Sequence, residues 1–233
     1  MEQIQNNRVI TDLYRENAQF PGIALDGSDV YLCWQRFVDR HDSLMASCRR
    51  GDEVVWEREI SDGGEVLHPV ILAHGGAIWY AWSEYARENW RILARCYRDG
   101  QWGEVLTVAS GEALFFPRLF TWQGKLHVIW TEQHKGSAAA VLCPLTEAGP
   151  GAAETVSVVG EAYRAGAAEG GDGNLYVAYD GFDGKQYKLF ARARTAAGWS
   201  EEIVVSQGED WASTPWIAAK PDGAVVGLSL IHI

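Results

Sequence analysis

The chain has 233 residues, of which 47% are hydrophobic, and a formal net charge of −11 at pH 7. This apolar content is enough to bury one large core. The acidic balance argues against nucleic acid and anionic membrane surfaces as partners, and no apolar run approaches the ~18 residues of a membrane-spanning helix.

The first residues, MEQIQNNRVI, contain neither the basic region nor the apolar segment of a secretory signal. Residues 8–21, RVITDLYRENAQFP, resemble the segment that closes a later unit, VLTVASGEALFFP at 105–117. We therefore predict that an N-terminal strand completes the last unit of a ring. The four cysteines form no disulfide framework, since Cys48 and Cys96 occupy one repeat position. Buried free thiols and a cytoplasmic location are expected.

From residue 21 onward the sequence repeats with a period of about 48 residues. Four similar phrases contain an apolar run that closes on an aromatic residue and then turns polar: DVYLCWQRF (29–37), AIWYAWSEY (77–85), KLHVIWTEQ (125–133) and NLYVAYDGF (174–182). The closing aromatics, spaced by 48, 48 and 49 residues, are Trp34, Trp82, Trp130 and Tyr179. A proline or its stand-in lies 13 residues before each: Pro21, Pro69, Pro117 and Gly166, with Pro215 next. A fixed period predicts an array of structural repeats.

Each unit contains four candidate strands. In the first unit these are residues 21–25, 30–34, 44–50 and 54–61, and the later units span 69–110, 117–160 and 166–207. The apolar and polar residues alternate with period two, which is typical of strands and argues against a helical solenoid. Four strands per period of about 48 residues predict an all-β fold, a β-propeller of four-stranded blades. We expect four complete blades and part of a fifth, in one domain over residues 1–227.

The fifth unit begins at Pro215 and loses the repeat register at Leu228, where an aromatic residue is due. The last six residues, LSLIHI, read like a sequencing adaptor translated in frame. We interpret residues 228–233 as a library artefact and expect the parent protein to continue beyond residue 227.

The loops on one face of the predicted propeller are the candidate binding surface. A glutamate occurs four to six residues before each proline position, often with an aromatic residue nearby. Aromatic faces and carboxylates together suit a carbohydrate ligand, although a repeated glutamate also fits a purely structural role in the turns. The candidate ligand-binding residues are Glu65, Glu84, Tyr85, Arg87, Trp90, Glu112, Glu132, Glu161, Tyr163, Glu209 and Trp211.

Catalytic and metal signatures are weak. Glu84 and Glu132 occupy equivalent positions in neighbouring units and could form a glycosidase pair across a cleft. The histidines show no ligand spacing such as HxH or HExxH, so no metal and no cofactor are expected.

The phrase pattern P-x-I/L, G-x-I/L-x-V/A-W and I-x-A-R, clearest in 69–110 and 166–207, resembles the sialidase-like (BNR-type) propeller superfamily. The resemblance runs from Pro21 to Gly227 and implies the propeller fold. It leaves activity open, since DGQWG (99–103) and AGWS (197–200) retain only the Gly and Trp of an Asp-box. FPRL (116–119) also places its proline before the arginine, unlike the sialidase signature.

Three functions remain compatible with the sequence. The first is a non-catalytic module that binds a glycan or another small polar ligand through its upper-face loops. The second is a sialidase- or glycosidase-type enzyme with some catalytic residues beyond residue 227. The third is a scaffold that binds a protein of opposite charge, with strongly salt-sensitive affinity.

Overall fold

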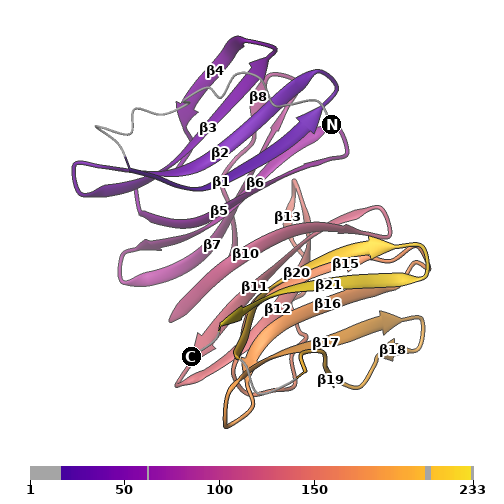
Figure 1. Ribbon diagram of the computed structural model, residues 1–233. Coiled ribbons are helices and arrows are strands. Elements are labelled where there is room, and N and C mark those ends of the chain that lie inside the picture. Colours follow the sequence, from indigo (N-terminus) through magenta and orange to yellow (C-terminus); the bar gives the residue numbers. More distant parts are fainter. Residues whose placement is uncertain (1–16, 62, 208–210, 232–233) are drawn as a thin grey trace.

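The computed structural model describes residues 17–61, 63–207 and 211–231, and these form antiparallel sheets (Figure 1). The first blade comprises β1 (Asn17–Asp26), β2 (Asp29–Val38), β3 (His41–Arg50) and β4 (Glu53–Glu59). The second comprises β5 (Glu65–His74), β6 (Ala77–Ala86), β7 (Asn89–Arg98), β8 (Gln101–Trp102) and β9 (Leu106–Gly111). In the second blade, β8 and β9 both pair with β7, so together they take the place of one outer strand.

The third and fourth blades repeat this arrangement. The third comprises β10 (Ala113–Trp122), β11 (Lys125–His134), β12 (Ser137–Thr146), β13 (Gly149–Pro150) and β14 (Glu154–Thr155). The fourth comprises β15 (Ala162–Glu169), β16 (Leu175–Phe182), β17 (Tyr187–Thr195), β18 (Gly198–Trp199) and β19 (Ile203–Val204). A fifth sheet has two strands, β20 (Trp211–Lys220) and β21 (Gly223–Ile231). The predicted propeller of four blades and part of a fifth is confirmed.

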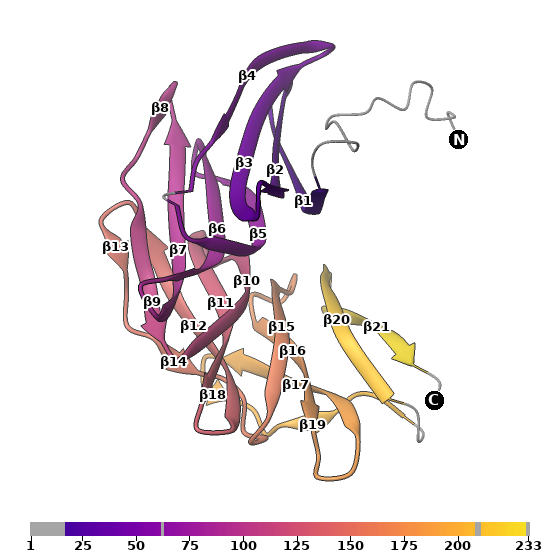
Figure 2. The ribbon, with the colours of Figure 1, turned by 90° about the vertical axis from the view of Figure 1, so that its left-hand side faces the viewer.

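The innermost strands of successive blades pack beside one another in the order β1, β5, β10, β15 and β20. Figure 2 shows these strands around a common centre, with the outer strands turned away from it. Because β1 and β20 come from opposite ends of the chain, both ends of the described sequence border that centre.

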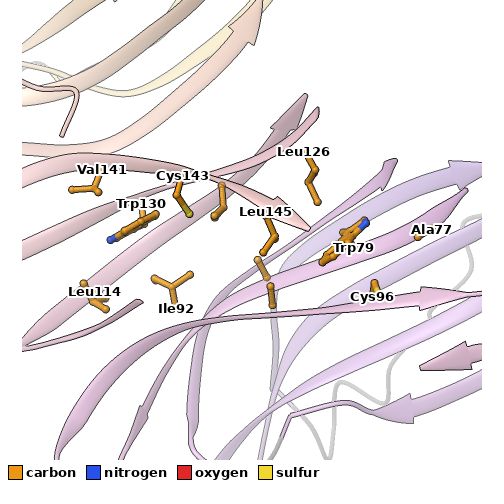
Figure 3. Packing of buried hydrophobic residues seen from close by; sticks show 13 residues of the cluster. Ala77, Trp79, Ile92, Cys96, Leu114, Leu126, Trp130, Val141, Cys143 and Leu145 are labelled. Atoms are coloured by element: carbon orange, nitrogen blue, oxygen red, sulfur yellow. The ribbon is translucent and has the colours of Figure 1, made fainter. Parts of the chain in front are cut away.

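The core lies between neighbouring blades. One cluster joins blades 2 and 3 through Trp79, Cys96, Trp130 and Cys143 (Figure 3). Similar clusters join blade 1 to blade 2 and blade 3 to blade 4. The closing aromatics are 0–5% exposed and therefore pack between the sheets: Trp34, Trp82, Trp130 and Tyr179. All four cysteines are buried and free, as expected.

The turn tryptophans are also packing residues. Trp102 lies 5.0 to 5.4 Å, between ring centroids, from Trp56, Tyr80 and Tyr97. Trp199 donates a hydrogen bond from Nε1 to Glu154 at 2.7 Å. The outer edge of the third blade consists of two strands of two residues each, β13 and β14, as does that of the fourth blade, with β18 and β19.

One detail of the repeat prediction is wrong. In the paired register Gly166 faces Ala178, and it corresponds to Gly22, Val70 and Arg118, which each follow the proline. The residue at the proline position of blade 4 is therefore Ala165. The extra residue lies in the turn between β15 and β16, which spans 170–174 where the other blades use two residues.

Two further predictions fall at the chain ends. The N-terminal closing strand was placed in residues 8–21, most of which lie outside the described residues. Strand β21 extends to Ile231 and so includes part of the segment interpreted as an adaptor. Among the described residues, no helix is long and apolar enough to cross a membrane.

Candidate functional site

Each innermost strand is interrupted at the same place by a β-bulge. The pairing register shifts between Gln19 and Gly22 in β1, and at equivalent points in β5, β10, β15 and β20. One residue in each bulge has a left-handed backbone, with φ of 51°, 53°, 55°, 36° and 54° respectively: Phe20, His68, Phe116, Arg164 and Thr214. We call these five the bulge residues.

The bulge residues hold their conformation against local preference. A left-handed φ costs a residue other than glycine roughly 1 kcal/mol, and it is a pronounced outlier for a β-branched residue such as Thr214. Four of the five also precede a proline, a position that favours extended backbone. Glycine would relieve the strain, yet none of the five is glycine. Strain retained at equivalent points of five blades points to a use for these side chains.

The side chains meet in one pocket. A cavity of about 620 Å³ opens at the centre of the propeller and is bordered by all five innermost strands. Its lining includes the five bulge residues, the residues at the next positions and an apolar wall: Pro21, Gly22, Ile23, Pro69, Val70, Ile71, Pro117, Arg118, Leu119 and Trp216. We call this the central pocket.

Arg118 lies over the ring of one aromatic residue, Trp216. Its guanidinium is 4.9 Å from the ring centroid of Trp216 in blade 5. Gly166 is the equivalent residue of the intervening blade and contributes no side chain to the pocket; an added Cβ would lie 3.3 Å from Ile217 Cγ2. Burial lowers the pKa of Arg118. Among the described residues no carboxylate forms an ion pair with it, so its positive charge faces the pocket.

His68 is a neutral member of the aromatic lining. Its ring lies 5.0 Å from Phe20 and 4.2 Å from Phe116, between ring centroids. Burial, with a smaller contribution from the positive charge of Arg118, lowers its pKa from 6.5 to about 4. His68 therefore presents an uncharged imidazole to the pocket at neutral pH.

Arg164 is held by a buried carboxylate. Its Nη2 lies 2.5 Å from Oδ2 of Asp180, which is fully buried. Burial raises the pKa of Asp180, while the neighbouring Arg164 guanidinium and the backbone amide of Thr214 oppose that rise. The backbone of Arg164 is bound as well: its N–H donates a hydrogen bond to Oγ1 of Thr131, in the preceding blade, at 3.1 Å. The residue after the closing aromatic thus binds the bulge of the next blade.

Among the residues that the structure describes, no carboxylate lines the central pocket. Glycoside hydrolysis ordinarily needs two carboxyl groups that flank the bond. Asp180 is fully buried and forms an ion pair with Arg164. The described residues contain no group of three or more His, Cys, Asp or Glu side chains that could hold a metal ion. Among the described residues, the lining therefore offers aromatic faces and two guanidinium groups.

The residues predicted from the sequence lie elsewhere. Of the ten that the structure describes, none borders the central pocket, and Glu209 falls outside the described residues. The placement of Glu84 on an accessible loop is wrong. Its carboxylate is fully buried, accepts a hydrogen bond from Trp82 Nε1 at 3.1 Å and pairs with Arg91 at 2.5 Å. Glu84 and Glu132 therefore do not form an accessible catalytic pair.

The other predicted residues form separate groups on the rim. Glu65 and Arg87 border a hollow in blade 2, with Trp90 against Tyr85 beside it. In blade 3, Glu112 lies 3.2 Å from His134, which borders another hollow with Glu132. Tyr163 and Trp211 both contact Tyr187 at 6.2 and 5.4 Å between ring centroids, and Glu161 accepts a backbone hydrogen bond from Phe182.

Sequence reasoning missed the central pocket although its signal was present. The prolines served only as markers of the period. The residue before each proline, and the one after it, differ from blade to blade, while the closing aromatics hardly change. Variation beside a repeated proline was the available sign that these positions are not fixed by packing between the sheets.

The sequence matches no protein-family model and no curated protein. Its fold is similar to those of solved carbohydrate-active propellers. An endo-arabinase from Bacteroides thetaiotaomicron is 12% identical, with a TM-score of 0.57 over 92% of this chain and 94% of that one. A mannose phosphorylase from Leishmania mexicana is 10% identical, with a TM-score of 0.58 over 93% and 81%.

The fold is also similar to that of a subtype N10 neuraminidase-like protein of A/little yellow-shouldered bat/Guatemala/060/2010, at 9% identity. That alignment has a TM-score of 0.57 and covers 82% of this chain and 58% of the other. At these identities the likeness concerns the propeller fold.

Proposed function

We propose that this chain is a non-catalytic β-propeller module that binds a saccharide in its central pocket. The observation that carries the proposal is the lining itself: three aromatic side chains, a neutral imidazole and two arginines, with no described carboxylate. Aromatic rings offer flat apolar faces to the C–H faces of a sugar, and guanidinium groups donate to its oxygens. The similar structures include an endo-arabinase and a mannose phosphorylase, which favours a carbohydrate ligand.

The charge of the pocket favours one class of saccharide over another. Arg118 and Arg164 place two cationic groups at the centre of a protein whose net charge is −11. The ion pair with Asp180 neutralises Arg164 in part, and Arg118 has no such partner among the described residues. A saccharide that carries a carboxylate or sulfate group would compensate that charge, so we expect acidic saccharides to bind more tightly than neutral ones.

The test is a binding panel combined with an assay for hydrolysis. We would measure binding of arabinan, mannan, polygalacturonate, heparin and sialylated glycans to the purified full chain, and the release of reducing ends from each. We expect binding of at least one acidic glycan and no release. Absence of binding to the whole panel would overturn the saccharide proposal, and turnover that depends on a pocket residue would show an enzyme.

A matched pair of variants connects binding to the pocket. Trp216 and Val225 are both exposed on blade 5, at 65% and 56%, but only Trp216 borders the pocket. We expect Trp216→Ala to weaken binding by roughly threefold to tenfold, the range given by one lost aromatic contact. Val225→Ala should leave the affinity unchanged.

A further inference from the structure

Aromatic pairs occupy the tips of the second hairpin in two of the four complete blades. In blade 2, Tyr85 and Trp90 are directly opposite on β6 and β7. In blade 4 the equivalent pair is Phe182 and Tyr187 on β16 and β17. The same positions in blades 1 and 3 hold the pairs Phe37–Asp42 and Gln133–Ala138. Cross-strand aromatic pairs stabilise hairpins, but two blades form this hairpin without one, so closing the hairpin does not explain the pairs.

The pair in blade 2 continues inward as a series of ring contacts. Between ring centroids, Tyr85 is 5.3 Å from Trp90, Trp90 is 4.6 Å from Phe115, and Phe115 is 6.1 Å from Phe116. Phe116 is a bulge residue and lies 4.2 Å from His68. We call Tyr85, Trp90, Phe115 and Phe116 the aromatic ridge. It runs from the rim of blade 2 to the central pocket.

The ridge is accessible at its outer end. Tyr85 is 39% exposed, and the three inner residues are half-buried. At the inner end of the ridge, Phe116 lines the central pocket. The series therefore connects two accessible sites, the rim and the pocket.

Polar groups lie beside the outer end of the ridge. A hollow of about 580 Å³ is bordered by Glu65, Tyr85, Arg87, Arg91 and the Gly63–Gly64 backbone, and we call it the rim hollow. Gly64 packs directly on the buried Glu84, since an added Cβ would lie 2.4 Å from its Cγ. Glycine backbone thus forms part of the wall, and the side chains of Glu65 and Arg87 supply acceptors and donors next to the exposed Tyr85 ring.

We infer that the ligand is an extended saccharide chain, with one residue in the central pocket and the following residues along the aromatic ridge to the rim hollow. This inference rests on the proposed function and adds the length and direction of the ligand. Successive sugar rings offer repeated apolar faces, which match successive aromatic rings. Their hydroxyl groups would accept from Arg87 and donate to Glu65.

The experiment is a chain-length series measured by titration calorimetry. The probes are the monomer to the hexamer of whichever polymer in the panel above binds the full chain. We expect affinity to rise with length until the ridge is occupied and then to stay constant. In Tyr85→Ser we expect roughly threefold to tenfold weaker binding of the hexamer and unchanged binding of the monomer.

Two controls separate the ridge from the hairpin. Phe182→Ser disrupts the equivalent pair of blade 4 and should leave the length dependence intact, while Tyr85→Phe keeps the ring and should bind as the unaltered chain does. Thermal unfolding of each variant reports any loss of folding. Equal affinity for monomer and hexamer, or equal loss from Tyr85→Ser and Phe182→Ser, would overturn the inference while leaving the proposed function standing. Failure of every glycan to bind would instead remove the proposed function itself.

Discussion

The closing aromatics and the bulge residues both recur once per blade, and they differ in what changes along the chain. The closing position keeps one kind of side chain, Trp in three blades and Tyr in the fourth, buried between sheets. The bulge position keeps one backbone conformation but carries Phe, His, Phe, Arg and Thr in turn. Within this repeat protein, the constant side chain coincides with a packing requirement, and the constant backbone with varying side chains coincides with the lining of the central pocket.

The largest test of this contrast is the loss of a closing aromatic. Trp82 is fully buried in the cluster between blades 1 and 2. Trp82→Ala should lower the free energy of unfolding by about 3–5 kcal/mol, because it removes a large buried side chain and leaves a cavity. It also leaves the buried Glu84 without the indole donor. Chemical denaturation measures the change; a loss below about 1 kcal/mol would contradict the packing role.

The pH dependence of stability tests the environment of His68. Its pKa is about 4 in the folded chain against 6.5 unfolded, so between these values the unfolded chain binds the extra proton. Stability should therefore fall as pH falls through this window, by roughly 1–2 kcal/mol at pH 5 from this residue. His68→Gln should reduce the difference between pH 7 and pH 5. Burial also lowers the pKa of His127, so a smaller slope of the same sign should remain; an unchanged slope would contradict the assignment to His68.

A smaller effect is expected where one blade binds the next. Thr131 Oγ1 accepts the backbone N–H of Arg164 at 3.1 Å. Thr131→Val keeps the shape and removes the acceptor, so it should cost about 1 kcal/mol of stability. Thr131→Ser retains the acceptor and should lose less. Equal losses from Thr131→Val and Thr131→Ser, measured by denaturation, would show that this hydrogen bond does not stabilise the bulge.

The smallest effect on stability is expected at a strained bulge residue, where a substitution should weaken binding while it hardly changes stability. Thr214 has φ of 54°, which glycine adopts without a Cβ penalty. Thr214→Gly should change stability by less than about 1 kcal/mol, since relief of strain offsets the added chain entropy of glycine. Binding of a panel glycan should weaken, because a pocket wall is lost. If Thr214→Gly were much less stable yet bound the glycan normally, Thr214 would be a packing residue and not part of the proposed binding surface.

The period, the closing aromatics and the strands could be predicted because each rests on a pattern read directly in sequence. The bulges could not, since a residue before proline favours extended backbone locally, and only the packing of five innermost strands around one centre imposes the left-handed turn. Glu84 was misplaced for a similar reason. Sequence spacing put it near a loop, but its partners Trp82 and Arg91 draw it into the sheet. The stand-in for proline was shifted by one residue because an insertion in the turn at 170–174 cannot be located from spacing alone.

The repeated bulge has a consequence for how such a protein can change over generations. Five separately encoded positions face one cavity, and each lies on the same backbone geometry. A substitution at one of them alters a single sector of the cavity and leaves the other four sectors and the sheets as they were. The lining of the cavity can therefore diverge by independent single steps after the duplication of a blade, without an intermediate that has lost its fold.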